Sequence, residues 1–160
     1  MSPGCDAVIV QAPAPVMCTK DGAVAELTKA SRLDPDDPDT QNALGAASQQ
    51  KGDTAGAISH FREALLLRPK DVSARSNLAH SLVLQGKLDE AVANLREILR
   101  TTPNDPDTHN DLGTVLTIKK DFPQAAAEFE RALRIAPDHA IARKNLERVK
   151  AQLHSPTSLR

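Results

Sequence analysis

Hydrophobic positions recur along most of the chain at a fixed interval of 34 residues. Five series keep this interval: Pro35, Pro69, Pro103 and Pro137; Ala23, Ala57, Ala91 and Ala125; Leu44, Leu78, Leu112 and Leu146; Leu27, Phe61, Leu95 and Phe129; and Ala30, Ala64, Ile98 and Ala132. Because five independent series share one interval, the pattern indicates a tandem repeat.

Within each unit the apolar residues follow the spacing of an amphipathic helix. In the second half of the first full unit, one stripe is formed by Ala57, Ile58, Phe61, Ala64 and Leu65. Residues 91–99 and 125–133 repeat this i, i+3, i+4 spacing, which is typical of a helix with one buried face. The first halves contain small residues such as Gly45 and Gly113, which would let two paired helices approach closely. We therefore predict one helix pair per unit, with full units at 38–71, 72–105 and 106–139.

Residues that end and start helices fall at the predicted boundaries. Gly52 and Gly86 stand where the first helix of a pair should close in a left-handed conformation, which glycine adopts without strain. Lys120 takes this position in the third unit, at a conformational cost. Carboxylates that can cap free N–H groups lie at or near the predicted helix starts: Asp39, Asp53, Asp71, Asp105 and Asp121.

This pattern resembles the tetratricopeptide repeat family. The resemblance rests on Ala43-Leu44-Gly45, Gly52, Ala57, Phe61, Ala64 and Pro69, and on their echoes 34 residues later. It implies an all-α fold, an α-solenoid of antiparallel helix pairs in a right-handed superhelix. First helices would line a concave groove and second helices would form the convex back. Successive pairs would stack, because each pair needs a neighbour to bury its apolar stripe. Where the family usually has large aromatic residues, this chain has Gln41, Ser48, Arg75, Leu82 and His109.

The ends of the chain fit the repeat less well. We predict an irregular segment over 1–20, a partial repeat over 21–37, a capping helix over 140–153 and a flexible tail over 154–160. Pro13 and Pro15 stand where the first helix of the partial repeat would fall, and they forbid a regular helix interior.

Composition argues against nucleic-acid binding and membrane insertion. Lys and Arg total 20 against 21 Asp and Glu, so the chain lacks the basic surplus that drives nucleic-acid binding. With no Trp, no Tyr and three Phe, it also lacks a stacking platform for bases. No apolar run is long enough to insert into a membrane, and the N-terminus does not read as a signal peptide. Cys5 and Cys18 fit no zinc or redox spacing, so we predict reduced thiols in a cytoplasmic protein.

The sequence carries no motif that would predict catalysis. The glycines form no phosphate-binding loop, and the GxSxG and HExxH motifs are absent. No two of the five histidines stand four residues apart, and Asp34–Asp39 lacks the glycine and closing glutamate of a calcium loop. We therefore predict no catalytic residue, no cofactor and no metal.

Helix phase places the fourth, fifth, sixth and ninth residues of each unit at the concave wall. The candidate peptide-binding residues are Asn42, Arg75, Asn77, His80, His109, Asn110, Asp111, Thr114, Lys144 and Asn145. Asparagine is a poor residue for a helix interior, yet Asn42 recurs as Asn110 and Asn77 recurs as Asn145. Two interpretations stay open: these residues are neutral filler or stabilise the helix pair, or their amides clamp the backbone of an extended peptide.

The resemblance also indicates which ligand to exclude. Some members of the family grip a C-terminal carboxylate with lysine, asparagine and arginine side chains, but here only Asn77 matches that set. Asp107 and Asp111 occupy two of the other places and would repel a carboxylate. A partner segment with charges of both signs, or a polar uncharged one, fits these residues better.

The predicted function is a non-catalytic scaffold that binds a peptide segment of a partner protein in the concave groove. One alternative is a regulatory or substrate-docking module of an enzyme, for example a glycosyltransferase. Another is a self-assembling repeat protein, with weak self-association through its incompletely covered ends.

Overall fold

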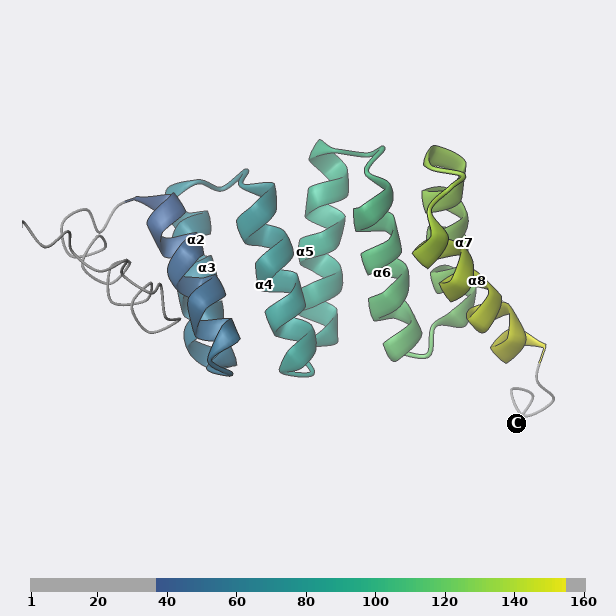
Figure 1. Cartoon of the computed structure of the whole chain (residues 1–160), viewed down its shortest axis with the longest axis horizontal. Helices are drawn as coiled ribbons and strands as arrows, with labels where there is room; N and C mark the ends of the chain where they lie inside the picture. The colour runs from purple at the N-terminus through teal and green to yellow at the C-terminus, as the bar shows by residue number, and fades with distance from the viewer. Residues whose placement is uncertain (1–36, 155–160) are drawn as a thin grey trace, which may run out of the picture.

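The computed structural model describes residues 37–154, and within this range it contains seven α-helices and no strand (Figure 1). The first helices of the units are α2 (Pro38–Gln50), α4 (Val72–Leu84), α6 (Pro106–Ile118) and α8 (Ala140–Leu153). The second helices are α3 (Thr54–Leu67), α5 (Leu88–Thr101) and α7 (Phe122–Ile135). The expectations for 1–20, for most of the partial repeat and for nearly all of the tail lie outside the described residues.

The helices form a single row of antiparallel pairs (Figure 1). Each helix packs mainly on the helices before and after it in sequence, and α2 also contacts α4 while α6 contacts α8. This arrangement confirms the predicted all-α solenoid. The first helices begin at Pro38, Val72, Pro106 and Ala140, the first residues of the units inferred from the repeat. No helix in the described part of the chain has the length and apolarity needed to cross a lipid bilayer.

One continuous core runs through the stacked pairs. It extends from Ala57 in α3 to Val149 in α8 and includes the fully enclosed rings of Phe61 and Phe129. Alanines at the repeated contact positions have no exposed surface: Ala57, Ala91 and Ala125. Because their side chains are short, neighbouring helix axes can approach, and the larger side chains fill the space between successive pairs.

Glycine and phenylalanine form matched pairs inside two of the units. A Cβ added at Gly45 would lie 2.5 Å from Phe61 Cε1, and one at Gly113 would lie 2.7 Å from Phe129 Cε1. The middle unit has Ala79 and the smaller Leu95 at the same two positions. The size of the second-helix residue therefore sets which small residue the first helix can carry.

Helix termini follow the sequence signals closely. Gly52, Gly86 and Lys120 all have a positive φ, at 83°, 75° and 63°, which confirms the left-handed closure, including the strained lysine. Asp37, rather than Asp39, caps α2, while Asp39 lies within its first turn. Four further helices have aspartate caps, at Asp53, Asp71, Asp105 and Asp121.

The glycine–phenylalanine pairs predict a coupled effect on stability. Gly113→Ala is expected to lower the free energy of unfolding by about 1–3 kcal/mol, because the new methyl group collides with the Phe129 ring. In a Phe129→Leu background this cost should shrink, since Ala79 and Leu95 already form that combination in the middle unit. Urea denaturation of the two single variants and the double variant measures the coupling. An equal cost of Gly113→Ala in both backgrounds would contradict this account.

A second prediction concerns Ser81, which is 0% exposed in α4. Its Oγ has no hydrogen-bond partner among the described residues, so the hydroxyl lost its contacts with water on folding and gained nothing. Ser81→Ala should therefore leave stability unchanged or raise it by up to about 1 kcal/mol. Thr108→Ala is the control: Thr108 is also buried, but its hydroxyl donates to Asp105, and its loss should be destabilising. A marked destabilisation by Ser81→Ala, measured by the same denaturation, would refute this.

Candidate functional site

The fourth residues of the second and third units and of α8 tie their helices to the turn before them. Arg75 and Arg143 donate to the backbone carbonyls of Pro69 and Pro137, each six residues upstream. His109 meets the carbonyl of Pro103 in the same way, with 3.1 Å between Nε2 and the oxygen. These turn carbonyls follow the second helices, where the helical ladder no longer provides a donor. Arg75 and His109, both candidate site residues, thus make contacts at the junction between units.

His109 is held from both sides. The residue is 6% exposed, and its Nδ1 lies 2.7 Å from Oε2 of Glu128 in α7. Both ring nitrogens of His109 thus lie within hydrogen-bond distance of an oxygen acceptor, Glu128 on one side and Pro103 on the other. In the first unit the corresponding contact joins His60 and Gln41, at 2.9 Å. This position links first helix, second helix and turn.

The recurring asparagines pair with each other across adjacent units. Asn77 Nδ2 donates to Asn42 Oδ1 at 3.1 Å, and Asn145 Nδ2 donates to Asn110 Oδ1 at 3.1 Å. Each pair joins two successive first helices, α2 to α4 and α6 to α8. Of the two interpretations of the asparagines, these contacts favour helix packing for Asn42 and Asn110, whose amide oxygens are occupied.

The junction between α4 and α6 departs from this pattern. Ser76 and Asp111 occupy the positions that Asn42 and Asn77 occupy one unit earlier. A pocket of about 340 Å³ opens here, which we name the α4–α6 pocket. Its polar lining comprises Ser76, Asn77, His80, Asp111 and Thr114, and its apolar lining comprises Ala79, Val83, Leu95 and Val115. Four candidate site residues therefore meet at the junction that lacks an asparagine pair.

A second pocket of about 350 Å³ lies between α6 and α8, and we name it the α6–α8 pocket. Its polar lining comprises Thr114, Thr117, Asn145, Arg148 and Gln152, and its apolar lining comprises Ile118, Phe122, Phe129 and Val149. Thr114 lines both pockets, so the two hollows adjoin across α6.

Five candidates, Asn77, His80, Asp111, Thr114 and Asn145, line these pockets, whereas Lys144 is exposed and lines neither. The sequence analysis did not identify Arg148 or the apolar floors. Arg148 stands one helical turn after Lys144 and Asn145, so its place on that stripe was the available signal. Within residues 37–154, no group of three or more histidine, cysteine or acidic side chains could hold a metal ion.

Electrostatics single out Asp111. Asp111 remains exposed to solvent, but partial burial of its carboxyl at the pocket wall raises its pKa above 3.8, and Asp107 and Asp105 add to this rise. The Asn110 amide, 3.5 Å away, and His80 oppose it. The carboxyl is thus a poorly compensated negative charge that a cationic group of a ligand could neutralise.

Comparison with known proteins identifies the repeat. Three family models, each described as a tetratricopeptide repeat, match residues 20–72, 48–110 and 106–139. Together they span residues 20–139 without a gap. The comparison with curated proteins gave no match.

Solved structures share the arrangement of helices. MamA from Desulfovibrio magneticus RS-1, from residue 41 to its end, superposes with a TM-score of 0.78 at 19% identity, covering 84% of this chain and 76% of MamA. YrrB, described as a TPR protein with an unusual peptide-binding site, gives 0.75 at 23% identity, over 80% of this chain and 66% of YrrB. The matched chain of the APC/C hetero-tetramer Cut9–Hcn1 gives 0.75 at 28% identity, over 81% of this chain but 26% of that one.

The raised pKa of Asp111 predicts a pH-dependent cost to folding. A carboxyl that is harder to ionise when folded destabilises the protein as pH rises from near 3.8 through its folded pKa. Asp111→Asn removes this cost, so the variant should be more stable than the parent at pH 7, and the difference should vanish as pH falls below the unfolded value. Urea denaturation across this range tests it, with the exposed Asp138→Asn as control. A constant difference at all pH values would exclude the carboxyl charge as the cause.

Proposed function

Because this chain belongs to the tetratricopeptide repeat family, we propose that it is a non-catalytic scaffold that holds a peptide segment of a partner protein along α4, α6 and α8. The observation that carries this proposal is the pair of adjoining pockets that share Thr114. Each has an apolar floor for a small side chain and polar groups at its wall for a peptide backbone. The description of YrrB as a peptide-binding protein on the same fold supports it.

The charges around the pockets favour a particular kind of segment. Asp111 stands in the α4–α6 pocket and Arg148 in the α6–α8 pocket. A segment with one basic and one acidic side chain, separated by small apolar residues, would be complementary to both pockets in one orientation only. Its basic group would also relieve the uncompensated carboxylate of Asp111.

The amides available for backbone contacts are few. Asn77 and Asn145 already donate one hydrogen to a neighbouring asparagine, so each retains its carbonyl oxygen and a second hydrogen for a ligand. At about 1 kcal/mol for each hydrogen bond, such contacts support binding on the order of micromolar. Affinity of this size suits a scaffold that exchanges its partner.

Selection from a random peptide library, followed by titration of the selected peptides, tests the proposal. Thr114→Phe should weaken the selected peptides at least about tenfold, because a large ring on the wall that the two pockets share then narrows both. The matched control is Ser73→Phe, which adds the same ring at an exposed position of α4 outside both pockets. The proposal fails if no charged or polar peptide is selected, or if the two variants bind the selected peptides equally well.

A further inference from the structure

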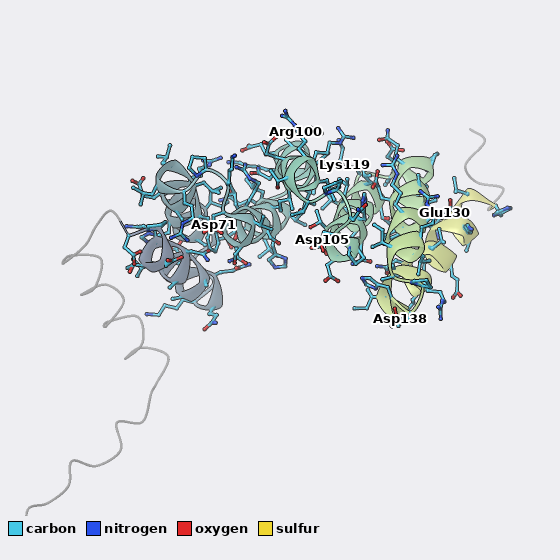
Figure 2. The ribbon with its side chains drawn as sticks, turned by 90° about the horizontal axis from the view of Figure 1, so that it is seen from above. Asp71, Arg100, Asp105, Lys119, Glu130 and Asp138 are labelled. Atoms are coloured by element: carbon cyan, nitrogen blue, oxygen red, sulfur yellow. The ribbon has the colours of Figure 1, made fainter. Side chains whose placement is uncertain are left out.

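A third hollow lies between the second helices, away from the two pockets on α4, α6 and α8. It has a volume of about 500 Å³ and is walled by the C-terminal halves of α5 and α7. Four arginines line it: Arg96 and Arg100 from α5, and Arg131 and Arg134 from α7. We name it the α5–α7 cleft. In Figure 2, Arg100 lies at one edge of the molecule and Asp138 at the opposite edge.

Few acidic groups offset these arginines. Arg134 has no hydrogen-bond or ion-pair partner among the described residues, and Arg96 meets only the neutral amide of Gln124, at 3.4 Å. Arg100 pairs with Glu97 of its own helix at 3.1 Å, but its side chain is 78% exposed. Ion pairs as exposed as this one contribute little, so Arg100 can exchange its partner for another carboxylate.

The one acidic residue that lines the cleft, Glu128, already contacts two other side chains. Glu128 is 12% exposed; its Oε1 accepts from Arg131 at 2.8 Å, and its Oε2 lies 2.7 Å from His109 Nδ1. Its charge is therefore balanced within the protein and does not neutralise Arg96, Arg100 or Arg134. The cleft keeps a positive surplus although the whole chain is nearly neutral.

An alternative explanation for these arginines is that they stabilise the C-terminal ends of their helices through the helix dipole. The equivalent positions between α3 and α5, one unit earlier, allow a comparison. The positions one unit earlier hold Arg62, Leu66, Glu97 and Arg100. There Arg62 pairs with Glu90 at 2.9 Å, and Arg100 pairs with Glu97. These four positions therefore hold two arginines and one acid at the preceding junction, against four arginines at the α5–α7 cleft, so the repeat itself does not require the arginine cluster.

We propose that the α5–α7 cleft binds an acidic segment of a partner protein, whose carboxylates pair with Arg96, Arg100 and Arg134. The guanidinium groups come from two neighbouring units, so an extended segment lying across both helices can reach all three. Each guanidinium can accept a carboxylate with two parallel hydrogen bonds. This surface is separate from the peptide pockets, and the same molecule could hold two segments at once.

Fluorescence anisotropy with a labelled short peptide in which Glu alternates with Ser tests this, with the Gln–Ser peptide as its neutral counterpart. The full chain should bind the Glu peptide and not the Gln peptide, and added salt should weaken the binding. The double variant Arg96→Gln/Arg134→Gln should lose at least about tenfold in affinity. The matched control, Arg62→Gln/Lys70→Gln, removes the same total charge from exposed positions outside the cleft and should lose less than about twofold.

Three results of the anisotropy comparison would overturn the proposal, and a fourth comes from Thr114→Phe. They are equal binding of the two peptides, unchanged binding by the cleft variant, and an equal loss in cleft and control variants, which would indicate net charge alone. Thr114→Phe separates this inference from the proposed function, because Thr114 lines both peptide pockets and does not line the cleft. If Thr114→Phe abolishes Glu-peptide binding, the peptide occupies the pockets and the cleft assignment is wrong. Circular dichroism of each variant verifies that the helices remain folded.

Discussion

No helix pair within residues 37–154 can bury its own apolar stripe, and the stacking of each pair on the next is the interaction on which the remaining structure depends. The core is one connected cluster from Ala57 to Val149, although contacts are made almost entirely between helices adjacent in sequence. Stability in such an array is a sum of local terms, each set by one pair and its neighbour. Packing at a junction is consequently exacting: Phe61 and Phe129 require glycine opposite them, whereas Leu95 accepts alanine.

Polar contacts fix how the stacked pairs are aligned. Arg75, His109 and Arg143 reach back to the carbonyl of a proline on the preceding turn, and in doing so provide donors that the end of a helix lacks. The asparagine pairs join first helices at two of the three junctions. At the remaining junction, Ser76 and Asp111 replace the pair and a hollow opens. The α4–α6 pocket, one half of the proposed peptide site, thus lies where the repeat departs from its own regular contacts.

The fold was predictable from the sequence because the same helix-forming and helix-ending residues recur in each unit. The 34-residue interval, the stripes on the second helices and Gly52, Gly86 and Lys120 fix the helix pairs and their ends without any knowledge of distant contacts. The sites were predictable only in part. Helix phase placed Asn77, His80, Asp111 and Thr114 on one face. It could not predict that the side-chain oxygens of Asn42 and Asn110 accept hydrogen bonds from asparagines of the next unit. Hydrogen-bond partners depend on the spacing between units, which is a tertiary property.

The α5–α7 cleft was hidden from sequence reasoning for a related reason. Arg96 and Arg100 on one helix and Arg131 and Arg134 on another resemble solvated helix faces when each is considered alone. Their surplus charge becomes evident only when Glu128 is seen to be held by His109 and Arg131. The only signal in the sequence was that Arg100 and Arg134 occupy the same place in consecutive units.

Thr114 belongs to both hollows on the first-helix face, and this shared wall makes their dimensions interdependent. A larger side chain there narrows both compartments together, and a smaller one merges them into a single longer channel. A single substitution at Thr114 would therefore change the length and width of the space offered to the proposed segment, without altering the packing that aligns the helices.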